Sequence, residues 1–358
     1  MSTSYWKNSV ILPQESPDIT IVGGGFIGLS VAYWLLLKKP SLKVWVLDHQ
    51  ALGEGASGRN AGFLTKGSLS FYEHLTGKWG EGSAIEVFNF AKESIELTIS
   101  HLNPADVIHT RSYSLYRGQK DFHFHGFTKM TSPLEQFENC FVSEGEKSIH
   151  PLRLLESLEN KVGQMGAVIY RGIEVLGVEA DLVHTTRGTI KRTQGVLALN
   201  GFSESVVAGV VTPQRGQMQC VELNDDLYLP GLIYGPESRV YFKFLEPGVM
   251  VIGGKRLVDE QAEQTSLLGI NPLIQQELSI YVESNLSKIK KIRAQWSGIM
   301  GFSSDELPLL EKRHSYYLIA GFSGHGMGLG FASARNVAEM ITDNKTSFFH
   351  ALRTRCRL

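Results

Sequence analysis

The sequence predicts an α/β fold in which a Rossmann-like part is interleaved along the chain with a second part rich in β-strands. From Asp18 to Asp48, a short apolar strand, a glycine-rich turn, an apolar helix and another apolar strand follow one another. A second strand, glycine-rich turn and helix begin at Tyr317. Between these two regions, segments such as Val240 to Phe244 alternate with a period of two residues, which is typical of strands.

The first region has the pattern of a β-α-β unit. Ile19 to Val22 and Val44 to Leu47 are short apolar runs, as expected for buried parallel strands. Residues 27–37 are apolar nearly all round, which predicts a buried helix between them. Asp48 closes the second strand, 20 residues after the last glycine of the turn.

The glycines of this turn have the spacing G-x-G-x-x-G. We expect Gly23 to allow the tight turn, Gly25 to let backbone amides approach a pyrophosphate, and Gly28 to let the helix pack closely on the strand. The helix N-terminus favours phosphate charge, and the carboxylate of Asp48 can accept from a ribose hydroxyl. The segment therefore predicts a dinucleotide site, and by itself it leaves NAD and FAD both open.

A second glycine-rich turn lies near the end of the chain. A strand at Leu318 to Ala320 enters the turn, and a helix is expected from about Leu329 to Ile341. Residues 49–67 form a third loop of glycines and small residues, in which Ser57 to Gly62 could begin a helix whose amides face a ligand. Together these turns suggest an elongated dinucleotide that is held at both ends.

Composition and charge exclude several other classes of protein. The chain has 358 residues, of which 42% are hydrophobic and 20% charged, as in globular proteins. The net charge of −1 does not indicate a basic surface that binds nucleic acid. We expect Arg353, Arg355 and Arg357 to form a solvated tail. Three cysteines without a motif, no signal sequence and no apolar run of membrane-spanning length predict a cytoplasmic protein without a membrane span. His123 and His125 are read as alternating strand residues, so no metal is expected.

Four blocks of the sequence resemble the FAD-dependent amine and amino-acid oxidase family, the group of D-amino-acid, glycine and sarcosine oxidases. In order they are IVGGGFIGLSVAYWL with VLD, GASGRNAGFL, GIEVLGV with VLALNGF, and WSGIMGFSSDELP followed by IAGFSGHGMGLG. The start SYW, at Ser4 to Trp6, and the GASGRNAG loop most resemble the gamma-glutamylputrescine oxidoreductase-like branch.

The resemblance implies that the cofactor is FAD and that a Rossmann-like FAD-binding domain is interleaved with a mixed antiparallel β-sheet substrate domain. The FAD-binding domain would comprise residues 1–75, 148–215 and 305–358, and the substrate domain residues 76–147 and 216–304. The partners would be a small-molecule amine or amino acid and oxygen or another electron acceptor.

The resemblance also implies a set of FAD contacts, which follow the chain from the first turn to the last. They are Gly23, Gly25, Phe26, Ile27 and Gly28 for the pyrophosphate turn; Asp48 and His49 near the adenosine ribose; Ser57, Arg59, Asn60, Ala61 and Gly62 in the loop; Glu174 and Val175 on the adenine side; Asn200 and Gly201; Met300; and Gly324, His325, Gly326, Met327 and Gly328 beside the flavin ring.

Met300 departs from two members of the family. Monomeric sarcosine oxidase links its flavin to a cysteine at the matching position, so we expect FAD to be bound non-covalently here. Glycine oxidase has an arginine there that grips the substrate carboxylate, and a thioether cannot form such a bidentate pair. Nothing in the spacing places Arg256 or Arg293 over the flavin, so we expect amines without an adjacent carboxylate to be better substrates than small neutral amino acids.

The implied reaction is the oxidation of a C–N bond, with hydride transfer to flavin N5 and hydrolysis of the resulting imine. The candidate catalytic residues are Lys255, which matches a lysine that assists reaction with oxygen, His325, which would stabilise flavin charge if protonated, and Tyr241, which shares one strand face with Lys243. Lys255 has an ordinary alternative as an exposed loop residue, and Tyr241 as a strand residue. Two other functions stay open: an NAD-dependent dehydrogenase, and a non-catalytic FAD-binding protein.

Overall fold

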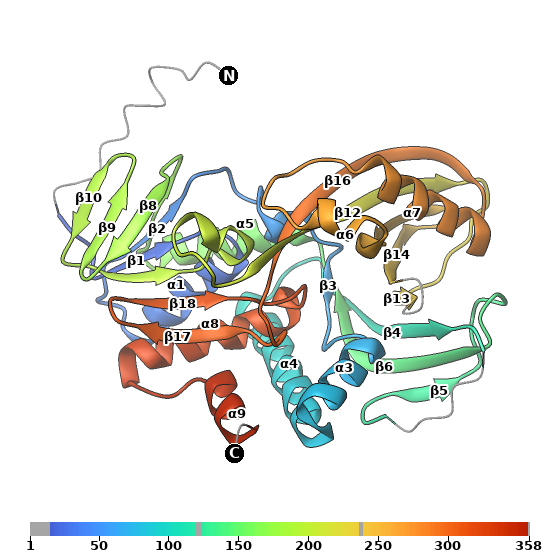
Figure 1. Cartoon of the computed structure of the whole chain (residues 1–358), viewed down its shortest axis with the longest axis horizontal. Helices are drawn as coiled ribbons and strands as arrows, with labels where there is room; N and C mark the ends of the chain where they lie inside the picture. Colours follow the sequence, from blue (N-terminus) through green and yellow to red (C-terminus); the bar gives the residue numbers. More distant parts are fainter. Residues whose placement is uncertain (1–14, 119–123, 236–238, 357–358) are drawn as a thin grey trace.

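The computed structural model describes residues 15–118, 124–235 and 239–356. His123 and Ser4 to Trp6, which are considered above, lie outside the described residues. Figure 1 shows two parts side by side, one built on a mainly parallel sheet and the other on a larger mixed sheet. The chain passes repeatedly between the two parts, so the predicted interleaving is confirmed.

A six-stranded sheet forms the core of the first part, in the order β17-β18-β11-β1-β2-β7. Its strands are β1 (Ile19–Val22), β2 (Val44–Asp48), β7 (Val168–Arg171), β11 (Gln194–Leu197), β17 (Leu309–Arg313) and β18 (Tyr316–Ala320). All neighbours are parallel except β17, which is antiparallel to β18 at the edge. The carboxyl ends of β1 and β2 therefore meet at one edge of the sheet, where open α/β sheets bind ligands.

The two faces of this sheet are covered differently. Helices share a hydrophobic cluster with one face, through strand residues such as Ile21 and Val46. Among them are α1 (Phe26–Lys38), α4 (Glu81–Leu102), α5 (Pro151–Gln164) and α8 (Gly326–Asp343). The other face carries Val22 and Leu47 and packs against a small three-stranded sheet (Figure 1). That sheet consists of β8 (Val175–Glu179), β9 (Leu182–Thr185) and β10 (Gly188–Lys191).

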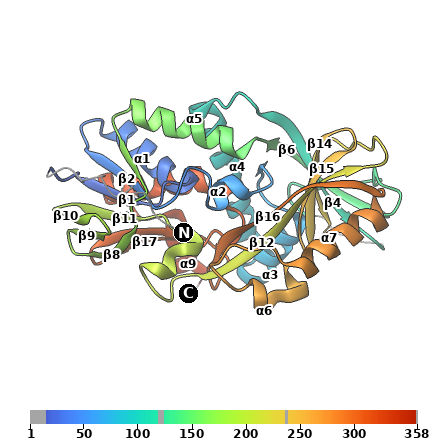
Figure 2. The ribbon, with the colours of Figure 1, turned by 90° about the horizontal axis from the view of Figure 1, so that it is seen from above.

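A nine-stranded mixed sheet forms the second part, in the order β16-β12-β15-β14-β13-β4-β6-β3, with β5 paired to β6. Its strands are β3 (Phe63–Leu64), β4 (Ile108–Tyr116), β5 (Thr128–Met130), β6 (Asn139–Ser148), β12 (Thr212–Leu223), β13 (Leu232–Gly235), β14 (Val240–Glu246), β15 (Val249–Gly254) and β16 (Ile289–Phe302). Helix α7 (Pro272–Asn285) packs on one face through Ile274, Leu278 and Val282. The long antiparallel pair of β12 and β16 runs from the first part into this sheet (Figure 2).

Two details differ from the sequence-based expectation. Helix α3 (Leu69–Trp79) is not foreseen, although Ser68 caps it by accepting a hydrogen bond from the Phe71 amide at 3.2 Å. The sequence also predicts one or two helices over Asn271 to Lys291, whereas α7 ends at Asn285 and Ile289 already begins the edge strand β16. The remaining short elements are α2 (Ala56–Arg59), η2 (Asn200–Ser205), η4 (Arg256–Asp259), α6 (Glu260–Glu263) and α9 (Phe348–Cys356).

Of the three arginines expected in a solvated tail, Arg355 is exposed, Arg357 lies outside the described residues, and Arg353 is packed. Arg353 lies in α9 and its guanidinium binds the carboxylate of Asp305, with Nε 2.6 Å from Oδ2.

Helix α4 shares a hydrophobic cluster with α1 and α8, whereas the boundaries given above place it in the substrate domain; those boundaries stay a prediction. Among the helices of the described residues, none combines the length and apolar character that crossing a membrane requires.

Candidate functional site

A cavity of about 850 Å³ lies between the two parts of the molecule. Its wall is formed by the glycine turn after β1, the end of β2, the loop at α2, the N-terminus of α8 and the faces of β12, β14 and β16 that carry Gly216, Tyr241 and Met300. This volume is near the upper end of the range for ligand pockets, about 300–1,000 Å³. The cavity is therefore large enough for an elongated ligand and a second small molecule.

Most of the residues expected to contact the cofactor line this cavity. They are Gly23, Gly25, Phe26, Ile27, Asp48, His49, Ser57, Arg59, Asn60, Ala61, Asn200, Met300, Gly324, His325, Gly326, Met327 and Gly328. Tyr241 also lines it. Outside its lining are Gly28, Gly62, Glu174, Val175, Gly201 and Lys255. The structure thus brings the two glycine-rich turns together, although they are about 300 residues apart in the sequence.

The first turn leaves no room for side chains on its glycines. Gly23 has a φ of +107°, and a Cβ there would lie 2.6 Å from the carbonyl oxygen of Ala198. A Cβ on Gly28 would lie 1.8 Å from the Gly23 oxygen, so Gly28 acts through packing and not by contact with the ligand. Gly25 faces the cavity, where a Cβ would approach the Ser57 hydroxyl to 2.8 Å.

The carboxylate of Asp48 is fixed by backbone amides at the same edge of the sheet. Its Oδ2 accepts a hydrogen bond from Gly24 at 2.8 Å, and its Oδ1 accepts one from Gln50 at 3.0 Å. The guanidinium of Arg171 lies 3.6 Å from Oδ2. Because each carboxylate oxygen has a second lone pair, Asp48 can still accept from a hydroxyl inside the cavity.

The loop from Ser57 to Gly62 is tied to the first turn and to the second sheet. The Ser57 hydroxyl accepts a hydrogen bond from the Phe26 amide at 2.9 Å. The Asn60 side chain is used within the loop, since it donates to the Ser57 carbonyl at 2.7 Å and accepts from the Gly62 amide at 2.8 Å. Arg59 donates to the Ser297 carbonyl of β16 at 3.3 Å. The loop is therefore held rigidly, unlike a flexible surface loop.

Asn200 connects the end of β11 with the second glycine-rich turn. Its side-chain oxygen accepts hydrogen bonds from the Gly321 amide at 3.0 Å and the Phe322 amide at 3.5 Å. Gly201 is packed behind Met300, because a Cβ there would lie 2.8 Å from the Met300 carbonyl oxygen. On the adenine side, the backbone of Glu174 pairs with Thr186 in the small sheet, at 2.9 Å for its carbonyl. Val175 is paired there as well, opposite Thr185.

His325 is uncharged at neutral pH. Burial lowers the pKa of its imidazole to about 4, against a raising effect from its hydrogen bond to the Ser323 carbonyl. The Nδ1–H donates that bond at 3.0 Å, and the ring stacks on Phe71 with centroids 3.6 Å apart. A protonated His325 is therefore not available to stabilise negative charge. The N-terminus of α8, which begins directly after His325, is the positive end of the helix dipole beside the second glycine-rich turn.

The second sheet supplies an apolar and aromatic wall. Tyr241 donates its hydroxyl to the Met218 sulfur at 3.4 Å, and its ring meets Phe63 edge to face at 5.9 Å. Burial raises the pKa of Tyr241 to about 12, so this group is a proton donor and not a base at neutral pH. Tyr234 also lines the wall and has its pKa raised by burial.

Lys243 shares the strand face of Tyr241, as expected from the alternation, yet it does not line the cavity. Its ammonium donates to the Ser148 hydroxyl at 2.8 Å and to the Ile149 carbonyl at 3.2 Å. It lies directly behind Gly62, where a Cβ would be 2.8 Å from Nζ. Burial lowers the pKa of Lys243 to about 8.

Lys255 faces away from the cavity. It adopts the left-handed conformation with a φ of +57°, which directs its ammonium toward α7, 3.6 Å from the carboxylate of Glu277. The geometry therefore does not support the expected role for Lys255. Arg256, the next residue, lines the cavity instead, although it was considered from the sequence and not placed there. The spacing carries no signal for this, because the side-chain direction depends on the turn at Lys255.

The residues present fit a dinucleotide better than they fit a metal. The glycine cradle, the fixed Asp48 and the N-termini of α1 and α8 all line one cavity. These are the features that bind ribose and pyrophosphate. In the described part of the chain, no group of three His, Cys, Asp or Glu side chains is arranged to hold a metal ion.

Comparison of the sequence with known proteins gives matches over almost the whole chain. The profile of a family described as "FAD dependent oxidoreductase", abbreviated DAO, matches residues 18–340. The chain is 24% identical to "Probable oxidoreductase OrdL" of Rhizobium meliloti (strain 1021), covering 94% of this chain and 86% of that protein. It is 25% identical to "Sarcosine oxidase subunit beta" of the same organism, covering 92% and 85%. It is 21% identical to "Glycine oxidase" of Bacillus licheniformis, covering 94% and 96%.

Solved structures share the fold at lower identity. Glycine oxidase from Geobacillus kaustophilus matches with a TM-score of 0.74 at 18% identity, covering 93% of this chain and 96% of that one. L-proline dehydrogenase from P. horikoshii matches with a TM-score of 0.75 at 18% identity, covering 94% and 96%. These likenesses confirm the predicted fold class.

The first prediction concerns Gly25. We expect Gly25→Val to lower the bound FAD to about a tenth or less, because the side chain blocks backbone hydrogen bonds to a charged group that are worth roughly 1.5–3 kcal/mol each. FAD content is measured from the flavin absorbance of the purified protein, and folding from circular dichroism. Gly77→Val is the control, since a Cβ on Gly77 meets nothing within 4 Å and Gly77 does not line the cavity. Full FAD content in Gly25→Val would refute the assignment.

The second prediction concerns the pH dependence of stability. A lysine pKa lowered from the ordinary value to about 8 destabilises the fold below about pH 8 by roughly 3 kcal/mol, and this cost disappears as the pH rises toward the unfolded-state pKa. We therefore expect Lys243→Met to be more stable relative to wild type at about pH 7 than at about pH 10. Urea unfolding at both pH values, with FAD in excess, measures the difference. A difference that is independent of pH would contradict the lowered pKa.

Proposed function

Because the chain belongs to the DAO family of FAD dependent oxidoreductases, we propose that it oxidises a C–N bond of an amine or amino acid. The observation that carries this proposal is the cavity that joins the two glycine-rich turns to the apolar and aromatic wall of Tyr241, Met218 and Phe63. The relatives named for sarcosine and glycine oxidation support the same class of substrate. Oxygen or another electron acceptor would complete the reaction.

The residues that would hold FAD are those of the cavity wall. The Gly23 to Gly25 turn and the first turn of α1 would receive the pyrophosphate, and Asp48 the adenosine ribose. Met300 and the segment from Gly324 to Gly328 would lie beside the flavin ring. When bound, FAD supplies a hydride acceptor at its N5 atom.

The protein's own groups would act by position and by dipole. Tyr241, Met218 and Phe63 would exclude water from the substrate, which strengthens the electrostatic interactions inside the cavity. The N-terminus of α8 would stabilise negative charge on a ligand beside Gly326. Tyr241 and His325 are both neutral near pH 7, so neither offers a charged acid or base, and a substrate amine that enters neutral needs none.

The two other functions considered from the sequence have less support. An NAD-dependent dehydrogenase is at odds with membership of an FAD-dependent family, and it leaves the second glycine-rich turn without a role. A non-catalytic FAD-binding protein would not need the apolar and aromatic wall of Tyr241, Met218 and Phe63, which faces the same cavity as the dinucleotide cradle.

The experiment that tests the proposal is anaerobic reduction of the bound flavin by a panel of amines and amino acids. Loss of the yellow colour with at least one C–N substrate is the expected result. A flavoprotein that stays oxidised with the whole panel, while dithionite bleaches it, would overturn the proposal. Measuring the same reduced protein after admission of oxygen, or of a quinone or dye, identifies the class of electron acceptor.

The third prediction is that FAD is bound non-covalently. Met300 stands where the linking cysteine of sarcosine oxidase would be. Its sulfur carries a methyl group in place of a free thiol, so it cannot form a covalent bond to the flavin. Among the cysteines, Cys140 is buried, and neither it nor Cys220 or Cys356 lines the cavity. After acid precipitation, the yellow colour should remain in the supernatant. Colour that stays with the precipitated protein would show a covalent bond.

A further inference from the structure

A fully buried carboxylate lies behind the cavity wall, at Glu146 of β6. Its Oε1 accepts a hydrogen bond from the Ser143 hydroxyl at 2.8 Å, and its Oε2 accepts one from the Lys66 amide at 3.0 Å. The Lys66 ammonium lies 3.5 Å from Oε1. Because these partners donate hydrogen bonds or carry positive charge, they stabilise the ionised form of Glu146.

The hydroxyl of Thr65 connects Glu146 with the cavity. Thr65 lines the cavity and forms side-chain hydrogen bonds with Glu146 and with Tyr234, which lines the cavity too. An ionised carboxylate can only accept, so Thr65 uses its single proton for Glu146 and accepts the proton of Tyr234. The Thr65 hydroxyl also accepts from the Gly67 amide at 3.2 Å. These side chains thus form a chain of hydrogen bonds that runs in one direction, from the cavity to the buried carboxylate.

The cavity end of this chain lies beside the proposed position of the substrate. The Tyr234 ring meets Phe63 edge to face at 5.5 Å, and Phe63 belongs to the wall proposed to hold the substrate. The Thr65 carbonyl lies against the second glycine-rich turn, since a Cβ on Gly328 would be 2.0 Å from its oxygen. Thr65 and Tyr234 therefore border the space between the substrate wall and the expected position of the flavin ring.

The surroundings of Glu146 make its carboxylate a stronger base than an exposed one. Burial raises the pKa of Glu146, and the charge of Lys66 and the hydrogen bonds from Ser143, Lys66 and Thr65 lower it in part. A carboxylate with a raised pKa is a better proton acceptor near neutral pH than an ordinary one. The Tyr234 phenol is neutral, because burial raises its pKa, so it can pass a proton on without holding a charge.

Other charged groups lie on the elements packed against Glu146. The Lys243 ammonium of β14 binds the Ser148 hydroxyl, two residues further along β6. On β4 and β6 the remaining titratable side chains near Glu146 are exposed or partly exposed, and they are His109, Arg111, Glu144 and Lys147. Arg111 and Glu144 bind each other at 3.4 Å. Lys66 and Tyr234 are therefore the groups that act most directly on the Glu146 carboxylate.

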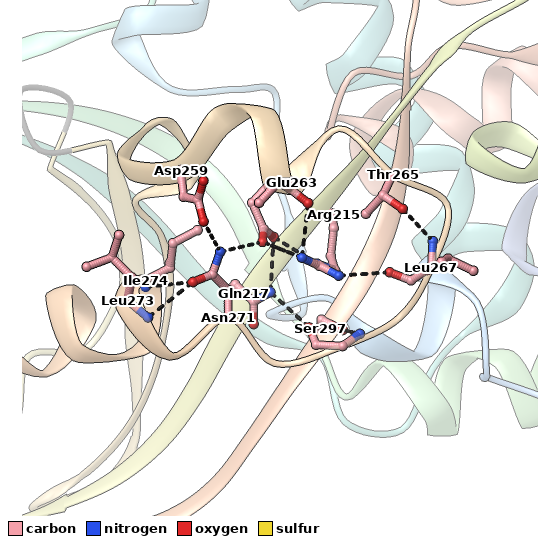
Figure 3. Close-up of polar contacts among 12 residues, drawn as sticks. Arg215, Gln217, Asp259, Glu263, Thr265, Leu267, Asn271, Leu273, Ile274 and Ser297 are labelled. Atoms are coloured by element: carbon pink, nitrogen blue, oxygen red, sulfur yellow. Dashed lines mark hydrogen bonds and ion pairs between the residues drawn. The ribbon is translucent and has the colours of Figure 1, made fainter.

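A second fully buried carboxylate, at Glu263 of α6, provides a contrast. It accepts from the Arg215 guanidinium at 2.7 Å and from Gln217 at 3.0 Å, and Asn271 donates to it at 2.9 Å (Figure 3). Glu263 and these partners lie outside the cavity lining of the described residues. This carboxylate therefore fastens the segment around α6 to β12, and its charge is balanced by a guanidinium.

We propose that Glu146 is the proton acceptor for a substrate that arrives as an ammonium ion, and that Thr65 and Tyr234 relay the proton to it. The inference rests on the proposed function and names the form in which its substrate binds. Alkyl amines, like the lysine side chain, are ammonium ions at neutral pH, and an ammonium has no lone pair to support hydride loss.

The relay balances as three proton transfers without any transfer of electrons. The substrate nitrogen gives a proton to the Tyr234 hydroxyl, Tyr234 gives its own proton to Thr65, and Thr65 gives its own to Glu146. The results are a neutral amine in the cavity and a neutral carboxyl group behind its wall. Reversal of the relay after product release restores the carboxylate.

The first test follows the proton without turnover. tert-Butylamine has no hydrogen on the carbon next to its nitrogen, so it cannot be oxidised. It is added to the FAD-loaded protein at about pH 7, where it is an ammonium ion, and infrared difference spectra record the C=O stretch of a protonated carboxyl group. We expect this band to appear in wild type and in Glu263→Gln, and to be absent from Glu146→Gln and Thr65→Val. A wild-type spectrum in which tert-butylamine produces no such band would overturn the inference.

The second test is the pH dependence of anaerobic flavin reduction by methylamine, butylamine and sarcosine. We expect Glu146→Gln and Thr65→Val to slow reduction at least about tenfold near pH 7, because the ammonium proton loses its acceptor. The difference should fade above about pH 10, where these amines enter neutral. Thr65→Ser keeps the hydroxyl and should follow the wild-type profile. Rates lowered by the same factor at every pH would show a structural role for Glu146 and refute the relay.

Glu263→Gln is the matched control, because it removes the other buried carboxylate, which has no partner in the cavity wall. It should keep the wild-type pH profile even where it lowers the melting temperature. FAD content and melting temperature show whether each variant is folded, and Glu146→Gln keeps an acceptor for the Ser143 hydroxyl. No flavin reduction by any amine in the wild type would refute the proposed function, while the infrared test still decides on Glu146.

Discussion

The structure depends on how closely helix α1 lies against its neighbours. A Cβ on Gly28 would lie 1.8 Å from the Gly23 carbonyl oxygen, and one on Gly330 of α8 would lie 2.4 Å from the Ile27 side chain. Because both positions are glycines, α1 packs directly on β1 and on α8. The Trp34 indole of α1 donates to the Phe331 carbonyl of α8 at 3.0 Å. Because α1 and α8 are in contact, their N-termini open into one cavity, and the two ends of the chain meet at the site.

The second constraint is the alternation along the β12 and β16 pair. Gly216 and Met218 face the cavity, whereas Arg215 and Gln217 point to the opposite side and bind Glu263. A shift of one residue in this register would exchange the two faces. The same ladder therefore sets the wall of the site and the anchor of the segment that follows β15. Because one pair of strands positions both, the sheet sets the distance between the dinucleotide cradle and the substrate wall.

Local patterns in the sequence predicted the fold class and the two glycine-rich turns that the structure brings to one cavity, whose contacts with FAD stay a prediction. Glycine spacing, short apolar strands and a terminal aspartate act within about 30 residues, so the β-α-β unit and the residues of its turn could be read directly. The substrate half of the site could not be predicted from such local patterns. Lys255 adopts a left-handed conformation and its ammonium lies near Glu277, while Arg256 lines the cavity. The neutral state of His325 follows from burial, which no spacing reveals. Helix α3 was missed because its polar residues weaken the apolar pattern over Leu69–Trp79.

The candidate acid and base groups of the site are mostly neutral. Near the second glycine-rich turn, His325 is neutral and the positive end of α8 is a dipole rather than an ion. Tyr241 is protonated, and the Lys243 ammonium is kept behind Gly62. The full positive charge in this region is that of Arg256, which lies over the Phe302 ring and is close enough to Tyr241 to lower its pKa, against the larger effect of burial. The carboxylates of Glu260 and Glu306 act on Arg256 in turn, so its charge is partly balanced by acids. An amine that enters without its proton would then meet neutral side chains at Tyr241 and His325, and its orientation would come from the shape and the dipoles of the wall.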